Sequence, residues 1–240
     1  MNSLMNEHDA EGSADRPVRL AFLISSGASH VLAVAEAVRQ GRLPHCEVAI
    51  ILCNIPGAHG AEATRAAGLQ TVTMEGRGRE QRDHEEAIDA LLRRMRVDLI
   101  CLAGYLRTLS GAFLRKWPDR VLSIHSSLLP AFPRSQPVAQ ALEYGAQVTG
   151  CTVSLMTDAL DGGVILAQRA VPIEDDDTVQ SVTERLLVEE HEAYINAIGN
   201  MLSGEYEIVG RKFRRRALQE HEAHEGAVPG FEQESAPMQA

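Results

Sequence analysis

The sequence predicts an α/β fold, in which a doubly wound, mostly parallel sheet carries helices on both faces and ends in a C-terminal antiparallel extension. Two observations lead to this fold class. Short apolar runs alternate with segments of helical periodicity over residues 18–124, a pattern typical of βαβ units. After residue 137 two extended runs are joined by a polar turn, which indicates an antiparallel pair.

The first half of the chain supplies the expected parallel sheet. Its strands are almost wholly apolar, which fits a sheet that is covered on both faces. We expect these strands at residues 18–25, 48–53, 70–74, 98–103 and 121–124. The intervening segments predict helices at residues 30–40, 61–67 and 79–96, with Ser29 as a candidate N-cap of the first and Gly68 as a stop signal of the second.

The second half supplies the expected extension. Helical periodicity predicts a short helix at 139–144 and a long helix at 178–202. Three aspartates precede the long helix, where negative charge favours the helix dipole. The extended runs lie at 147–156 and 164–171, and a last short strand is expected within 205–213.

Composition limits the classes of partner and compartment. We expect one domain at residues 18–225, with a disordered leader at 1–17 and a disordered tail at 226–240. The net charge of −10 argues against nucleic acid as a partner. No apolar run is long enough for a membrane span, and no secretory signal is present. The four cysteines form no CxxC pair and no zinc framework, so a cytoplasmic protein without a metal is expected, as a monomer or homodimer.

In doubly wound sheets, ligands bind beyond the carboxyl ends of the strands. The loop after Ser25 leads into a helix through small residues, which lets backbone N–H groups approach an anion. An ordinary strand-to-helix turn is the alternative. His125 directly follows a buried strand, in a position suited to acid–base chemistry. A histidine that is only hydrogen-bonded into its loop is the alternative there.

Two further loops, after Ala103 and after Met156, reach the same edge of the expected sheet. The loop after Met156 contains Asp158 and Asp161, followed by two glycines. These residues favour either a tight turn or a carboxylate that meets His125. The spacing alone does not decide between the two.

Five segments resemble blocks of the glycinamide ribonucleotide formyltransferase family, in the same order and at similar separations. They are LISSGASH, LAGYLRTLS, SIHSSLLPAFP, TVSLMTDALDGGVILAQ and RLLVEEHEAY, and the resemblance runs from about Leu20 to about Ile195. It implies the formyltransferase fold and transfer of a formyl group from 10-formyltetrahydrofolate, as co-substrate, to the amine of glycinamide ribonucleotide in purine biosynthesis. Both substrates are small molecules, and no metal is needed.

The resemblance also implies roles for particular residues. The catalytic group is His125, Asp161 and Ser123, in which the aspartate keeps the histidine charged and the other two stabilise a tetrahedral oxyanion. The residues implied on the folate side are Arg79, Leu106, Arg107, Thr108, Leu109, Thr157, Asp158, Ala159 and Leu160. Those implied on the phosphate and acceptor side are Ala28, Ser29, His30 and Glu190.

The sequence departs from the family pattern around this same site. Ser123 stands where the family has Asn, and a shorter hydroxyl replaces an amide donor there. Loss of one oxyanion donor costs roughly 10²- to 10³-fold in rate. The other departures are Ala28 for Gly, His30 for Asn, Ser126 for Pro, Arg134 for Gly and Ser154 for His.

These departures leave alternatives open. The chain is a formyltransferase with the family's acceptor, a formyltransferase with a different amine acceptor, or a catalytically impaired folate-binding paralogue. A formyl-folate hydrolase is a fourth hypothesis, which the short leader disfavours because that family usually carries an extra N-terminal domain.

Overall fold

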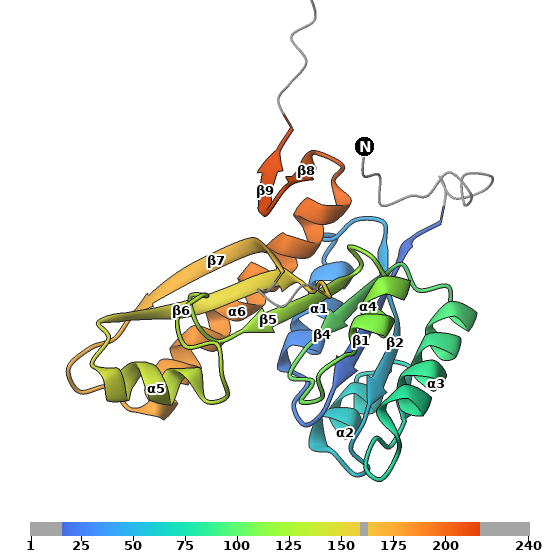
Figure 1. Cartoon of the computed structure of the whole chain (residues 1–240), viewed down its shortest axis with the longest axis horizontal. Helices are drawn as coiled ribbons and strands as arrows, with labels where there is room; N and C mark the ends of the chain where they lie inside the picture. Colours follow the sequence, from blue (N-terminus) through green and yellow to red (C-terminus); the bar gives the residue numbers. More distant parts are fainter. Residues whose placement is uncertain (1–15, 159–162, 217–240) are drawn as a thin grey trace, which may run out of the picture.

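The computed structural model of the chain describes residues 16–158 and 163–216 (Figure 1). The expected tail at 226–240, and the expected leader up to residue 15, lie outside the described residues. Their disorder, and the domain bounds drawn from it, stay predictions. All four cysteines are buried and free, as the absence of a disulfide pattern in the sequence indicated.

The strands form one sheet in the order β3-β2-β1-β4-β5-β6-β7-β9-β8 (Figure 1). Their bounds are β1 Val18–Ile24, β2 Cys46–Cys53, β3 Thr71–Thr73, β4 Leu99–Leu102, β5 Val121–His125, β6 Val148–Leu155, β7 Val164–Pro172, β8 Tyr206–Val209 and β9 Lys212–Arg215. The five strands from β3 to β5 pair in parallel, whereas β6 is antiparallel to both β5 and β7. The predicted fold class, with its parallel core and antiparallel extension, is confirmed.

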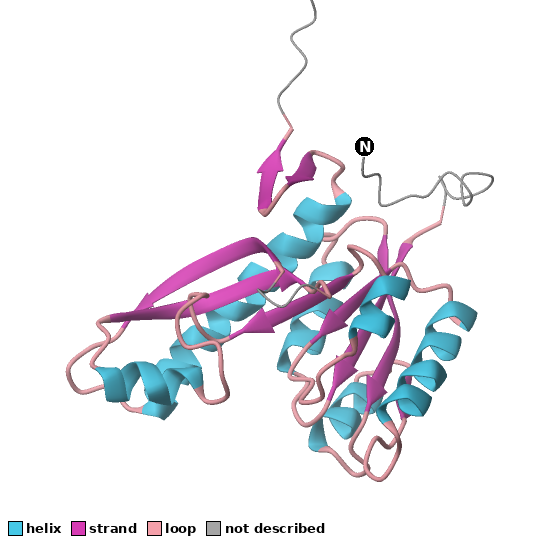
Figure 2. Cartoon of the chain, in the orientation of Figure 1, coloured by secondary structure: helices cyan, strands magenta, loops and turns pink. Residues whose placement is uncertain are grey.

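Helices cover both faces of the sheet (Figure 2). They are α1 Ser29–Arg39, α2 His59–Ala66, α3 Gln81–Arg94, α4 Gly111–Lys116, α5 Pro137–Tyr144 and α6 Val179–Leu202. Alternate residues of β1 lie in two hydrophobic cores, one on each face of the sheet. Leu20, Phe22 and Ile24 pack with α1 and α6. Ala21 and Leu23 pack with α3 and α4. Burial of each large side chain contributes about 1.5–3 kcal/mol, against about 0–1 kcal/mol for an exposed ion pair, so the two cores dominate the stability.

Two expectations about local structure are wrong. Ser29 is the first residue of α1, and the N-cap is Ala28, whose carbonyl accepts the Leu32 N–H at 2.9 Å. The single strand expected within 205–213 is a hairpin instead, because β8 and β9 pair antiparallel around a turn at Gly210. Gly210 has φ +62°, a conformation that glycine adopts without steric cost.

Helix α4 escaped the sequence analysis. It has six residues, which is too short for a 3.6-residue period to be recognisable. Its N-cap is Ser110, whose side chain accepts the Phe113 N–H at 3.1 Å. Phe113 and Leu114 then enter the core shared with α3, so tertiary packing stabilises a helix that the local sequence hardly specifies.

The long helix α6 crosses behind the centre of the sheet. Thr178 caps it through reciprocal bonds with Ser181, so the helix begins where the sequence predicts. Near its middle, the fully buried Tyr194 donates its hydroxyl to the carbonyl oxygens of Leu102 and Leu122, at 3.0 and 3.4 Å. One side chain therefore joins α6 to the ends of β4 and β5.

We expect Tyr194→Phe to lower the free energy of unfolding by about 1–2 kcal/mol, because it removes a buried donor while keeping the ring. Chemical denaturation followed by circular dichroism measures the change. Tyr206→Phe is the matched control, since the Tyr206 hydroxyl makes no hydrogen bond with any residue of 16–158 or 163–216 and its ring stacks on Phe213. Equal stability of the two variants would contradict a role for the Tyr194 hydroxyl.

Candidate active site

The order of the strands reverses between β1 and β4, because the chain runs outward from β1 to β3 and returns to β4 on the other side. Such a switch point opens a crevice at the carboxyl ends of the strands. The loops after β1 and β4 are joined there, since the buried Ser25 hydroxyl accepts the Leu106 N–H at 2.9 Å. Two of the four loops expected at the site therefore meet.

His125 is the last residue of β5, at the same edge. Its Nε2 lies 2.9 Å from the carbonyl oxygen of Phe132. A carbonyl oxygen only accepts, so Nε2 carries a proton and the ring orientation is fixed by the loop that follows. The hydrogen bond into the loop is real, and it leaves Nδ1 without a partner among the described residues.

Ser123 lies two residues before His125 on the same strand, so both side chains point to the same face of the sheet. Across the antiparallel pair, Ser123 faces Ser154 directly. Directly opposed residues bring their Cβ atoms to about 4.5–5.5 Å. Neither hydroxyl makes a hydrogen bond within residues 16–158 and 163–216. Two hydroxyl donors are thus placed side by side on the face that carries His125.

The predicted phosphate loop leads into α1. Ala28 is buried, and its φ of −136° is not in the left-handed region that favours glycine. The Ser29 hydroxyl lies 3.5 Å from Nδ1 of His30. The other ring nitrogen of His30, Nε2, lies 3.0 Å from Glu190 of α6. The structure brings Ser29, His30 and Glu190 together, while their role on the acceptor side stays a prediction.

The segment 106–109 lies between the switch point and α3. Leu106 is 77% exposed, whereas Leu109 is buried. The Gln81 side chain donates to the Thr108 carbonyl at 2.9 Å, and Arg107 donates to the carbonyl of Gly76. Helix α3 and the loop between β3 and α3 thus hold this segment in place, while the Leu106 side chain stays exposed.

Of the loop after β6, the structure describes Thr157 and Asp158. Asp158 pairs with Arg115 of α4 at 3.0 Å, which fixes this side of the loop next to α4. Ala159, Leu160 and Asp161 lie outside the described residues. The pairing of Asp161 with His125 therefore stays a prediction, as do the folate contacts of Ala159 and Leu160.

His84 is a residue of the site region that the sequence analysis missed. It lies on α3 and is almost completely buried, with Nε2 at 3.4 Å from the Tyr105 hydroxyl. Its Nδ1 is buried without a partner among the described residues. Burial lowers the pKa of His84, and the charges of Arg107 and Arg79 lower it further. A signal was present, because His84 precedes Ile88 by four residues and so falls on the apolar stripe of α3.

The charges of Arg79 and Arg107 both lower the pKa of His84, although the two arginines are 28 positions apart in the sequence. Arg79 makes no hydrogen bond or ion pair within residues 16–158 and 163–216. Arg79 is exposed, so its guanidinium is accessible to solvent, and its contact with the folate stays a prediction.

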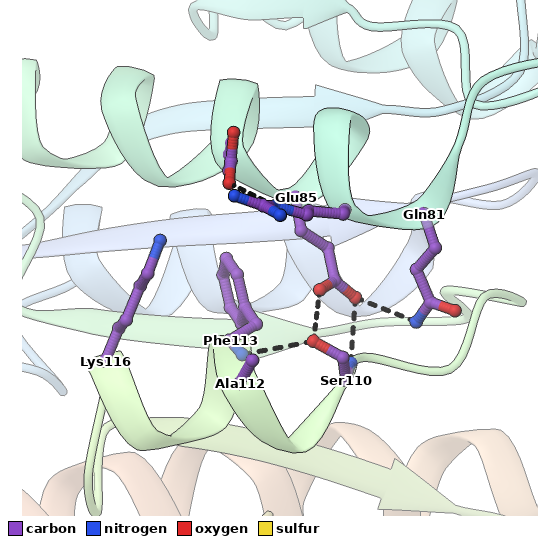
Figure 3. A pocket seen from close by; sticks show the side chains of 8 residues that line it. Gln81, Glu85, Ser110, Ala112, Phe113 and Lys116 are labelled. Atoms are coloured by element: carbon purple, nitrogen blue, oxygen red, sulfur yellow. Dashed lines mark hydrogen bonds and ion pairs between the residues drawn. The ribbon is translucent and has the colours of Figure 1, made fainter.

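A hollow of about 560 Å³ lies between α3 and α4 (Figure 3). In Figure 3 the carboxylate of Glu85 points to Ser110 and Gln81, and it accepts the Ser110 N–H at 2.8 Å. Lys116, also on its wall, pairs with Asp89 at 3.1 Å. Its charged groups are therefore already engaged. The Gln81 and Glu85 side chains on its wall tie α3 to the segment that leads into α4.

Within residues 16–158 and 163–216, no three His, Cys, Asp or Glu side chains are grouped so that they could hold a metal ion. None of the helices in those residues combines the length and apolar character needed to cross a membrane.

Comparison with known proteins agrees with the fold. The formyl transferase family matches residues 18–198. The chain is 31% identical over 185 residues to phosphoribosylglycinamide formyltransferase of Bacillus subtilis, covering 94% of that protein. The crystal structure of glycinamide ribonucleotide transformylase 1 from Symbiobacterium toebii superposes with a TM-score of 0.79, at 36% identity, covering 90% of this chain and 98% of that one. The chain belongs to the formyl transferase family.

Some relatives are much longer proteins. The chain is 36% identical over 193 residues to the trifunctional purine biosynthetic protein adenosine-3 of Drosophila melanogaster. That match covers 80% of this chain but spans only 14% of the length of the relative. The shared part is thus one unit of a larger protein there.

The lowered pKa of His84 predicts a pH dependence of stability. The unfolded chain protonates this histidine near pH 6.5, the folded chain only at lower pH. The free energy of unfolding therefore falls as the pH drops below about 6.5. His191, whose pKa is lowered by burial and then by His30, acts in the same direction.

We expect His84→Gln to make that decline shallower, measured by urea denaturation between about pH 8 and about pH 5.5. The curves of wild type and variant should run parallel at the alkaline end, where the imidazole is neutral in both states. Identical slopes at the acid end would contradict a buried neutral His84.

Proposed function

We propose that this protein transfers the formyl group of 10-formyltetrahydrofolate to the amine of glycinamide ribonucleotide. One observation carries the proposal: His125 and Ser123 share a face at the carboxyl end of β5, next to the crevice between β1 and β4. Membership of the formyl transferase family supports the reaction class. The names of the Bacillus and Symbiobacterium relatives support the acceptor.

In the proposed reaction, the acceptor's amine nitrogen attacks the formyl carbon, and the carbonyl π electrons move onto the formyl oxygen. The tetrahedral oxyanion accepts a hydrogen bond from Nδ1–H of protonated His125, whose Nε2 is already held by Phe132. The Ser123 hydroxyl supplies the second donor. Collapse of the oxyanion breaks the bond to N10 of the folate, which takes up the proton that the amine loses. Asp161 favours the charged form of His125 in this scheme.

The two substrates approach His125 from opposite sides in this proposal. The folate lies along residues 106–109 and the loop beginning at Thr157, with its carboxylates toward Arg79. The acceptor's phosphate lies at the N-terminus of α1, where Ala28, Ser29 and His30 begin the helix. Glu190 lies on the acceptor side. The reaction takes place in the cytoplasm between small molecules.

A specific observation favours a second candidate, which is formyl transfer to a different amine. Nε2 of His30 is engaged by Glu190, so it is not free to donate to a phosphate. A smaller or uncharged acceptor meets the same crevice without needing that donor. The folate side is unchanged in this alternative.

The direct test incubates the purified protein with 10-formyltetrahydrofolate and follows the deformylated folate spectroscopically, with and without glycinamide ribonucleotide. We expect turnover only when the ribonucleotide is present. Turnover in its absence would replace the proposal with hydrolysis. Folate binding without turnover under either condition would sink the ribonucleotide as acceptor and favour the second candidate.

The roles of Ser123 and His125 predict opposite effects of two substitutions. Ser123→Asn should raise kcat, by up to about 10²-fold, because an amide donor reaches the oxyanion better than a hydroxyl. His125→Ala should abolish transfer. His45→Asn is the control for loss of a histidine away from the crevice, because His45 is exposed just before β2, at the opposite end of the parallel strands. Full transfer activity in His125→Ala would remove the proposed role of that histidine.

A further inference from the structure

Glu190 is a buried carboxylate whose two oxygens are held by side chains from two other parts of the fold. Its Oε2 lies 3.0 Å from Nε2 of His30, and its Oε1 accepts the hydroxyl of Ser126 at 2.5 Å. The exposed fraction of the Glu190 side chain is 8%, and that of His30 is 15%. A carboxylate so far from water needs such partners to remain charged.

The two partners come from functionally different loops. His30 lies in the first turn of α1, directly after the loop proposed for the acceptor's phosphate. Ser126 directly follows His125. The partners are 160 and 64 residues from Glu190 in the sequence, so only the folded chain brings them together. Through one carboxylate, α6 is tied both to the acceptor side and to the proposed catalytic loop.

This contact leaves the carboxylate little freedom. A carboxylate only accepts hydrogen bonds, so Nε2 of His30 carries the shared proton. The His30 ring is wedged edge-on against His191 and Tyr194, with ring centroids 5.1 and 6.1 Å away. The imidazole is therefore not free to turn, and the Ser126 bond fixes the other oxygen. The lone pairs that remain on Glu190 point in set directions.

We propose that His30 and Ser126 are positioning residues for the acceptor, which act as one unit by holding the Glu190 carboxylate in a single orientation. The inference rests on the proposed function, in which Glu190 faces the acceptor. Because both hydrogen bonds end on the same carboxylate, the loss of either one releases its rotation. The second bond then contributes little to acceptor binding.

The test is steady-state kinetics of the full chain with 10-formyltetrahydrofolate and glycinamide ribonucleotide. Ser126→Ala and His30→Ala should each raise the KM for the ribonucleotide about tenfold or more, as expected for a lost hydrogen bond to a charged group. The kcat and the KM for the folate should stay within about twofold. The double variant should have a KM for the ribonucleotide close to that of the single variant with the larger increase. The increase should fall short of the product of the two single increases.

Conservative variants distinguish positioning from mere packing. Ser126→Thr keeps a hydroxyl and His30→Gln keeps an N–H donor, so both should recover most of the acceptor affinity. Glu192→Gln is the matched control on the same helix, because it breaks an exposed ion pair with Arg42 and touches neither loop. It should have the wild-type KM for both substrates.

Three outcomes would overturn the inference. Wild-type KM values in Ser126→Ala, or a double variant with the full product of both effects, would remove the cooperative unit while leaving the proposed function intact. No ribonucleotide-dependent turnover by the wild-type protein would overturn the proposed function and the inference together. If His30→Ala fails to fold in a thermal melt, Ser126→Ala compared with Ser126→Thr decides the question alone.

Discussion

The structure depends on β1 being buried on both faces. A strand covered by helices on either side has no access to water, so its backbone groups must all pair within the sheet. Strand β1 does so with β2 on one side and β4 on the other, in parallel on both sides. Parallel pairing brings the carboxyl ends of all three strands to one edge. The reversal of strand order at β1 is the switch point beyond which doubly wound sheets bind their ligands.

Helix α6 links the buried sheet to the proposed acceptor side. Tyr194 is anchored to the carbonyls of Leu102 and Leu122, so the helix has one position relative to β4 and β5. Glu190 precedes Tyr194 by one helical turn and lies on the same buried stripe. Its carboxylate is therefore delivered next to α1 and the loop after β5. The precision of the site comes from packing that is remote from the chemistry.

The sequence predicts those helices and strands that are long enough to show a hydrophobic period. The buried strands, the long helices and the position of His125 at a strand end all follow from local patterns, and the structure confirms them. Helix α4 and the hairpin of β8 and β9 do not follow, since six residues or fewer carry too little periodicity. His84 and Glu190 are polar residues on apolar stripes, which marks them as unusual without naming their partners.

Contacts between segments that are distant in the sequence could not be predicted from it. No local pattern pairs His30 with a residue 160 positions away, and none places Ser123 opposite Ser154. The family resemblance implies only that His30 lies on the phosphate and acceptor side. In the folded chain Nε2 of His30 is hydrogen-bonded to Glu190, so this nitrogen is not free to donate to a ligand.

Four of the six positions at which the sequence departs from the resembled family pattern fall in two groups, and Ala28 and Arg134 fall in neither. His30 and Ser126 meet at Glu190, and Ser123 and Ser154 face each other across β5 and β6. In a chain that has lost its function, each substitution is tolerated independently. Such substitutions are therefore not expected to fall at positions that contact one another. In a working site, contacting residues are coupled, so a change in one residue favours a compensating change in its partner. Under the proposed function, the grouping therefore favours an active site rebuilt around His125 over one that has decayed.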